Sequence, residues 1–189
     1  MDVIDELLTR GVAEVIVEAE LRKKLASGKK LRLKQGFDPS RPQMTIGNGV
    51  GLRKLRKFQE LGHTAVLIVG DWTAQIGDPS GRDESRPRLS AEVVRENAHT
   101  YMEQFFSIVD RDRTEVRWQS EWYGTFTLEN ALNLAGRFTL AQMLAHETFR
   151  KRYEAGNPLT ILELMYPMLQ GYDSVAVQAD VEFGGTDQK

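Results

Sequence analysis

The feature that most constrains the fold is a strand, a loop, a helix and a second strand packed into residues 30–71. Lys30–Gln35 alternates apolar and charged residues as a strand does, and the turn-rich stretch GFDPSRP follows it. A helix is predicted from about Gly47 to Leu61, where Gly62 ends it. TAVLIVGD is then a short apolar run typical of a strand buried on both faces. This order predicts an α/β fold built on a parallel sheet.

Helix-capping signals organise much of the remaining sequence. Thr139 with Gln142, and Thr160 with Glu163, have the spacing of capping boxes, within a helix-rich segment from about residue 128 to 173. The other expected elements are one or two helices within residues 2–26, a helix from its N-cap Ser90 to about Val109, and strands at Val116–Gln119 and in VAVQADVEF.

Composition narrows the functional classes. The chain has 189 residues, 41% of them apolar and 28% charged, and a net charge of −2 that gives no overall attraction to nucleic acid. The absence of cysteine excludes disulfides and zinc–thiolate sites, and the three histidines lack metal-like spacing, so no metal site is predicted. No apolar run approaches the about 20 residues that cross a bilayer, and the N-terminus is no signal peptide. We therefore expect a cytoplasmic protein without a membrane partner.

The stretch PQMTIGNG reads as the entrance to the first long helix. A helix N-terminus presents unpaired N–H groups and a partial positive charge, which stabilise a phosphate. Gly47 and Gly49 would let a flat base or a phosphate approach the backbone closely. The competing interpretation is a glycine-rich loop that enters an ordinary packed helix.

Two further stretches could bind a small polar ligand. Asp78 lies in the turn GDPSGR, which should leave the sheet at the strand ends where open α/β folds bind ligands, although a plain surface turn is the alternative. Tyr166, Gln170 and Asp173 share one face of a predicted helix that Pro167 should kink. A phenol, an amide and a carboxylate on one stripe suit an amino acid or a sugar, and a solvated stripe is the alternative.

The last stretch, GGTDQ, follows the final predicted strand. Its glycines would permit close approach of a ribose, and Asp187 could accept hydrogen bonds from ribose hydroxyls. The alternative is a terminal turn.

Taken in order, GFDPS, IGNG, IGDPSGR, YPMLQGYDS and GGTDQ resemble bacterial tyrosyl-tRNA synthetases, class I enzymes with a Rossmann catalytic domain. The resemblance runs from about Lys30 to Lys189. It implies a Rossmann-like parallel sheet flanked by helices, with a helical insertion at about residues 122–158 that carries a homodimer interface. It also implies that residues 1–189 are a partial catalytic domain, without the KMSKS-type loop or the anticodon-binding domains.

The resemblance implies a reaction and a tyrosine pocket. Tyrosine would be activated with ATP, and Mg²⁺ accompanying the ATP, to tyrosyl-adenylate and then transferred to tRNA(Tyr). The tyrosine-binding residues implied for this chain are Lys34, Asp78, Tyr166, Gln170, Asp173 and Gln188. Among these, Asp173 would accept a hydrogen bond from the substrate phenol, so that phenylalanine is rejected.

The resemblance also implies an ATP site with three departures from the family pattern. The ATP-binding residues would be Asp38, Gly47, Gly185, Asp187 and Gln188, and the catalytic ones Ser40, Thr45 and Asn48. Thr45 and Asn48 stand where the family has two histidines that stabilise the phosphates in the transition state, which predicts weak activity. Ser40 replaces a threonine, and Lys34 stands where one branch has a tyrosine.

Two alternatives remain from the sequence. The chain could be a non-catalytic paralogue that binds tyrosine or tyrosyl-adenylate, with a sensing or scaffolding role. A nucleotide-binding α/β protein of another family would require these ordered stretches to coincide by chance.

Overall fold

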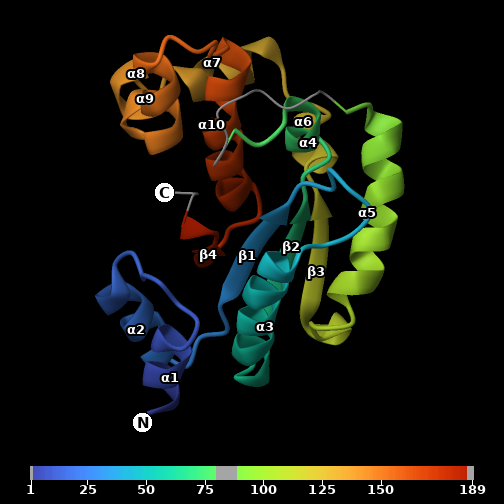
Figure 1. Cartoon of the computed structure of the whole chain (residues 1–189). Helices are drawn as coiled ribbons and strands as arrows, with labels where there is room; N and C mark the ends of the chain where they lie inside the picture. Colours follow the sequence, from blue (N-terminus) through green and yellow to red (C-terminus); the bar gives the residue numbers. More distant parts are fainter. Residues whose placement is uncertain (1, 80–88, 187–189) are drawn as a thin grey trace.

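The predicted parallel sheet is present in the computed structural model, which describes residues 2–79 and 89–186. Its strand order is β3-β2-β1-β4, and each neighbouring pair is parallel (Figure 1). The α/β expectation is therefore confirmed as a Rossmann-like arrangement. The strands are β1 (Arg32–Phe37), β2 (Thr64–Val69), β3 (Thr114–Trp118) and β4 (Val181–Phe183).

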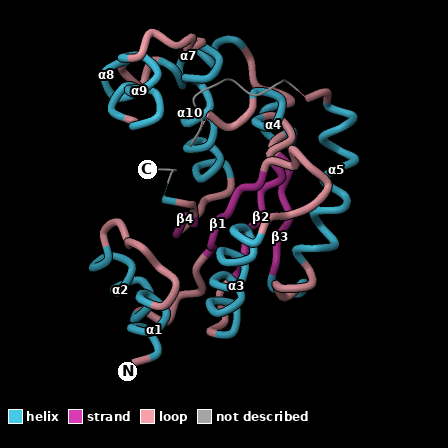
Figure 2. Tube along the Cα trace, viewed as in Figure 1, coloured by secondary structure: helices cyan, strands magenta, loops and turns pink. Residues whose placement is uncertain are grey.

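Helices cover both faces of the sheet and gather beyond its carboxyl end (Figures 1 and 2). The main helices are α1 (Val3–Thr9), α2 (Glu18–Ala26), α3 (Ile46–Glu60), α5 (Ala91–Phe105), α7 (Leu128–Ala135), α8 (Leu140–Ala145), α9 (Glu147–Glu154) and α10 (Ile161–Ala176). Short helical turns are α4 (Thr73–Ile76), η1 (Arg111–Arg113) and α6 (Ser120–Tyr123).

The alternation of side chains along β2 explains why both faces are covered. Ala65 and Leu67 join a core shared with α1, α3 and α5, whereas Val66 and Ile68 face Val177 at the end of α10. All four β2 side chains are fully buried. A continuous apolar strand of this kind is stable only between two helical layers. The third core, centred on Phe149, joins α7–α9 to α10.

The predicted capping signals are confirmed. Thr139 and Thr160 both form reciprocal capping boxes, and the Ser90 side chain accepts from the amide of Val93 at the start of α5. Pro167 lies inside α10, as the sequence predicts. These local signals fix where the helices that carry the candidate site begin.

The expected strand in VAVQADVEF is shorter than predicted. Val175 and Ala176 still belong to α10, and Gln178 turns the chain with a left-handed φ of 52°. Val177 is buried against the sheet at the helix end, so its apolar character reflects helix packing and not a strand. Only Val181–Phe183 pair with β1.

Across residues 2–79 and 89–186, no helix has the length and apolar character that a membrane crossing requires. The same residues contain no group of three or more His, Cys, Asp or Glu side chains that could hold a metal ion.

Candidate functional site

The carboxyl ends of the strands bring together side chains that are distant in sequence. Asp38 follows β1, and its two carboxylate oxygens accept hydrogen bonds from different elements. Oδ1 accepts from the Thr73 hydroxyl at 2.6 Å, and Oδ2 accepts from the Tyr166 hydroxyl at 2.7 Å. Asp38 is thereby fixed between α4 and α10. In open α/β sheets this edge is where ligands bind.

Gly70 makes this approach possible. It follows β2, and a Cβ added there would lie 2.1 Å from Asp38 Oδ1 and 2.6 Å from the Thr73 hydroxyl. The same atom would meet the Phe37 carbonyl at 3.2 Å, which is backbone and cannot turn away. A glycine is therefore required for the Asp38–Thr73 hydrogen bond to form.

Asp173 is the most buried carboxylate of the predicted site, with 2% of its surface exposed. Oδ2 accepts from the Gln119 amide at 2.7 Å, and Oδ1 accepts from the Trp122 indole at 3.1 Å. The Tyr123 hydroxyl lies 3.2 Å from Oδ1 but only 2.7 Å from the Leu169 carbonyl oxygen. Because the hydroxyl has a single proton, it donates to the nearer carbonyl oxygen. Burial raises the pKa of Asp173 to about 6, against the opposing effect of these donors and of Lys34.

Gln119 connects the two carboxylates. Its Oε1 accepts from the backbone amides of Trp72 and Thr73 at 3.2 and 2.9 Å, which leaves Nε2 to face Asp173. The Thr73 hydroxyl oxygen lies between the two residues, 3.0 Å from Gln119 Oε1 and 2.6 Å from Asp38 Oδ1. A hydrogen-bonded path thus runs Asp173–Gln119–Thr73–Asp38 across the strand ends.

Lys34 is buried on the α10 side of β1, with 1% of its side chain exposed. Its ammonium donates to Glu182 Oε1 at 2.5 Å and to the Gln170 carbonyl at 3.3 Å. The buried charge is thereby paired and hydrogen-bonded, as such burial requires. This contact places Lys34 against the helix that carries Tyr166, Gln170 and Asp173.

The N-terminus of α3 is built by local contacts. The Asn48 side-chain oxygen accepts from the Thr45 amide at 2.9 Å and hydroxyl at 2.8 Å, and the Asn48 amide donates back to Thr45 at 3.3 Å. Thr127 and Asn130 form the same box at the start of α7, with distances of 2.9, 2.8 and 3.2 Å. Thr45 and Asn48 therefore act as an ordinary helix cap.

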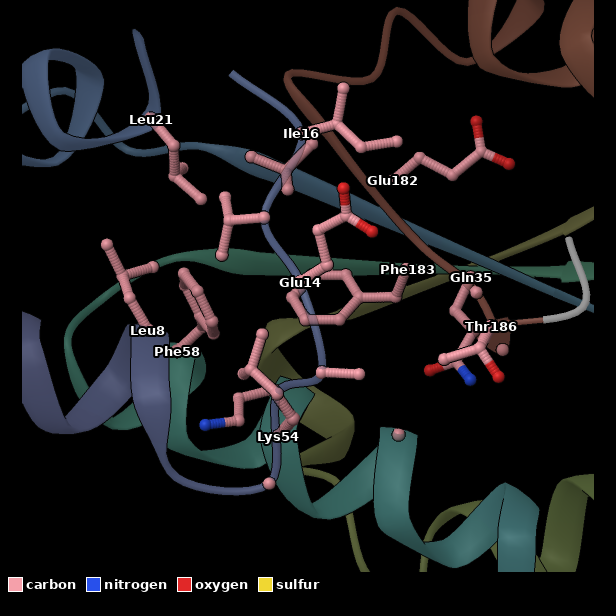
Figure 3. A pocket seen from close by; sticks show the side chains of 18 of the residues that line it. Leu8, Glu14, Ile16, Leu21, Gln35, Lys54, Phe58, Glu182, Phe183 and Thr186 are labelled. Atoms are coloured by element: carbon pink, nitrogen blue, oxygen red, sulfur yellow. The ribbon is translucent and has the colours of Figure 1, made fainter. Parts of the chain in front are cut away.

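A cavity of about 810 Å³ lies between α3, β4, the segment joining α1 to α2, and α10. Three predicted site residues line it: Gly47, Gln170 and Gly185. Gln35 faces Thr186 across this space (Figure 3), and its Oε1 is buried without a hydrogen-bond partner among the described residues. The cavity thus connects the helix entrance to the last glycines.

The remaining predicted residues fall in three groups. Ser40 is half-buried two residues after Asp38, whose carbonyl accepts from the Ser40 backbone amide at 2.7 Å. Asp78 is half-buried, two residues after the end of α4 at Ile76. Asp187 and Gln188 lie outside the residues that the structure describes.

Sequence reasoning missed several residues of this site. They are Gln119, Thr73, Trp122 and Tyr123, and Gln35 in the cavity wall. Gln119, Trp122 and Tyr123 follow β3 at positions i, i+3 and i+4, a spacing that places them on one face of a helical turn. Polar side chains directly after a predicted strand were the available signal.

Several exposed lysine and arginine side chains pair with carboxylates of the same chain. Lys24 and Lys29 lie near Asp180, and Arg56 and Lys57 pair with Glu60. Such exposed pairs contribute little to stability.

Comparison with known proteins identifies relatives for nearly the whole chain. The family described as "tRNA synthetases class I (W and Y)" matches residues 26–189. A tyrosine–tRNA ligase of Dehalococcoides mccartyi is 67% identical over 186 residues, which are 98% of this chain and 47% of that protein. The tyrosine–tRNA ligase of Oleidesulfovibrio alaskensis is 53% identical over 191 residues, 100% of this chain and 48% of that protein. The chain spans about half the length of the curated relatives it matches.

Solved structures give the same fold. A C-terminally truncated mitochondrial tyrosyl-tRNA synthetase of Aspergillus nidulans superimposes with a TM-score of 0.84 at 22% identity, covering 98% of this chain and 57% of that one. A tyrosyl-tRNA synthetase of Archaeoglobus fulgidus, solved with L-tyrosine, gives 0.76 at 23% identity and covers 100% and 57%.

Proposed function

Because the chain belongs to the class I tRNA synthetases of the tryptophan and tyrosine group, we propose that it forms the tyrosine-binding half of a tyrosine–tRNA ligase catalytic domain. The observation that carries the proposal is Asp173, a buried carboxylate held at the strand ends on the helix that also carries Tyr166 and Gln170. Its relatives at 67% and 53% identity bear the name of this enzyme.

The proposed pocket places the phenol of tyrosine at Asp173. A carboxylate has room for about four hydrogen bonds, and Gln119 and Trp122 supply two of them. The substrate hydroxyl supplies a further donor. Phenylalanine would occupy the same space without making that bond, and tyrosyl-tRNA synthetases are the established example of this discrimination.

The substrate ammonium would lie toward Asp78, Tyr166 and Gln170. The Tyr166 hydroxyl donates to Asp38, and a phenol oxygen is also a hydrogen-bond acceptor, which suits an ammonium. This orientation would direct the tyrosine carboxylate toward the adenylate site that we assign to Asp38, Gly47 and Gly185. Asp187 and Gln188 are proposed members of the same site.

The proposed reaction is attack of the tyrosine carboxylate on the ATP α-phosphate, which releases pyrophosphate, followed by transfer of tyrosine to tRNA(Tyr). The protein positions the reactants and stabilises charge on the leaving pyrophosphate. Mg²⁺ would arrive with the ATP phosphates, because the described residues offer no carboxylate cluster for it. The location that suits these substrates is the cytoplasm.

Activation is proposed to be weak. Ser40, Thr45 and Asn48 occupy the catalytic positions, but the hydroxyl of Thr45 and the oxygen of Asn48 are used by the α3 cap. The phosphates would then meet mainly backbone N–H groups and the helix dipole, without the imidazoles of the family pattern.

A homodimer is proposed through the segment at about residues 122–158. Large apolar side chains around it are exposed: Leu128 by 75%, Leu132 by 64%, Leu140 by 61% and Ile161 by 76%. A second copy that covers this face would remove them from water. Sedimentation of the protein tests this part of the proposal.

Titration with tyrosine and with phenylalanine tests the proposed pocket. We expect the chain to bind tyrosine, to reject phenylalanine, and to lose tyrosine binding in Asp173→Ala. Unchanged affinity in that variant would contradict the pocket. Circular dichroism of the variant controls for folding.

Tyrosine-dependent ATP–pyrophosphate exchange tests the activity. We expect slow exchange that rises when Thr45→His and Asn48→His are combined. Tyrosine binding without exchange in either form would favour the non-catalytic alternative.

A further inference from the structure

The ion pair between Lys34 and Glu182 joins the tyrosine pocket to the edge of the sheet. The two residues are register partners on β1 and β4. Lys34 has 1% of its side chain exposed, whereas Glu182 has 38% exposed and lines the large cavity (Figure 3). The Ser174 hydroxyl donates to Glu182 Oε2 at 2.7 Å, so both carboxylate oxygens are engaged. The carboxylate is thus held from β1 and from α10.

The position of this pair on α10 relates it to Asp173. Lys34 contacts the Gln170 carbonyl, one helical turn before Asp173, and Ser174 is the residue directly after Asp173. The pair therefore spans the part of α10 that carries the phenol-binding carboxylate. A buried ion pair adds little net stability by itself, since desolvation offsets the attraction. The position of the pair beside Asp173 therefore indicates a role in the tyrosine pocket.

We propose that Glu182 is a positioning residue for tyrosine binding: together with Ser174 it holds the Lys34 ammonium against α10, where that ammonium balances the charge of Asp173. This inference rests on the proposed function and adds a residue, Glu182, that acts through Lys34 and does not touch the substrate.

The charged and titratable groups around Asp173 are consistent with this role. From β1 the ammonium of Lys34 lowers the pKa of Asp173, and from α6 Tyr123 faces it as a neutral phenol whose own pKa is raised by burial. Gln119 and Trp122 donate to Asp173 as uncharged groups, whereas Glu182 of β4 pairs with Lys34. After the hydrogen bond from Gln119, the ammonium of Lys34 is therefore the group that most lowers the pKa of this carboxylate.

The test is the pH dependence of tyrosine affinity, measured by titration of the 189-residue chain between about pH 4.5 and 8. Tyrosine affinity should fall as protonation of Asp173 removes the charged acceptor. Lys34→Met should move the midpoint of this pH dependence to higher pH, because the Asp173 carboxylate loses its cation. Glu182→Gln should move it to lower pH, by about half a unit or more, because the ammonium is no longer neutralised.

The double variant separates an action through Lys34 from a direct effect of the Glu182 charge. If Glu182 acts through Lys34, adding Glu182→Gln to Lys34→Met should produce less than half of the shift that it produces alone. Glu60→Gln removes a carboxylate from an exposed lysine pair on α3 and should leave the midpoint unchanged.

Two results overturn the inference while leaving the proposed function intact: a Glu182→Gln midpoint equal to that of the unsubstituted chain, or an equal shift with and without Lys34. Absence of tyrosine binding in the unsubstituted chain overturns the proposed function, and this inference with it.

Discussion

The two ends of the proposed site are built in opposite ways. At the phenol end, Asp173 on α10 is 2% exposed and depends on Gln119 and Trp122, which lie more than 50 residues earlier in the chain. At the phosphate end, Thr45 and Asn48 are three residues apart and satisfy one another. One end is a product of tertiary packing, and the other is a product of local capping.

This difference predicts different consequences of substitution at the two ends. Replacing a capping pair alters one helix entrance and leaves the core in place, as the matching Thr127–Asn130 box on α7 illustrates. Replacing a member of the phenol end leaves buried donors or acceptors unpaired, which costs about 1–3 kcal/mol for each group. Substitutions at the phenol end should therefore affect which amino acid binds, and substitutions at the phosphate end should affect the activation reaction.

The largest expected effect is the coupling of Asp173 to stability. The pKa of Asp173 is about 6 in the folded chain, whereas its ordinary value, which applies to the unfolded chain, is 3.8. The folded state therefore binds the proton more tightly. Its stabilising contribution is complete below pH 3.8 and is lost as the pH rises through about 6. The difference amounts to about 3 kcal/mol, since each unit corresponds to about 1.4 kcal/mol.

Urea unfolding from pH 4 to 7 measures this coupling. The unfolding free energy of the unsubstituted chain, minus that of Asp173→Ala, should decrease as the pH rises. The same subtraction with Thr45→Ala should show no such slope, because the Thr45–Asn48 cap contains no titratable side chain. A flat difference for Asp173→Ala would contradict the contrast between the two ends.

The second effect concerns Gln119. Gln119→Leu removes the amide that connects Asp173 to the amides of Trp72 and Thr73, and should weaken tyrosine binding by about 10- to 100-fold. ATP affinity should change less, because Gln119 reaches the proposed adenylate site only indirectly, through Thr73 and Asp38.

Gln59 provides a matched control for this substitution. It is also 1% exposed and also bridges backbone groups, those of Asp110 and Arg113, but it lies at the far end of α3. Gln59→Leu should lower stability and leave tyrosine affinity unchanged. Equal losses of affinity in both variants would show that Gln119 acts through stability alone.

The fold was largely predictable because its signals are local. The apolar run of β2, the caps at Ser90, Thr139 and Thr160, and the β–α–β order each follow from periodicity or capping chemistry. VAVQADVEF was misread because Val177 is apolar to pack the end of α10 on the sheet. Apolar character alone does not distinguish a strand from a buried helix end.

The site was predictable only in part. Tyr166 and Asp173 share a helical face, and this follows from spacing. That Tyr166 bonds Asp38, and that Gln119 bonds Asp173, depends on which strand ends lie side by side. The order β3-β2-β1-β4 places these residues together, and sequence spacing does not contain that order.

The smallest effect is expected at the phosphate end. Thr45→Ala removes the hydroxyl that caps α3 and should lower the unfolding free energy by about 1 kcal/mol. Thr127→Ala removes the equivalent hydroxyl from α7 and should cost a similar amount, because the two boxes have nearly identical distances. Thermal unfolding compares the two variants directly.

Ligand titrations on the same pair then separate capping from phosphate binding. Tyrosine affinity should stay within about twofold in both variants, because neither hydroxyl contacts the phenol end. ATP affinity should fall in Thr45→Ala alone, since only α3 presents its N-terminus to the proposed phosphates. Equal ATP affinities in Thr45→Ala and Thr127→Ala would remove the phosphate role from this helix entrance. A large loss of tyrosine affinity in Thr45→Ala would instead show that the two ends are coupled, against the local construction of the cap.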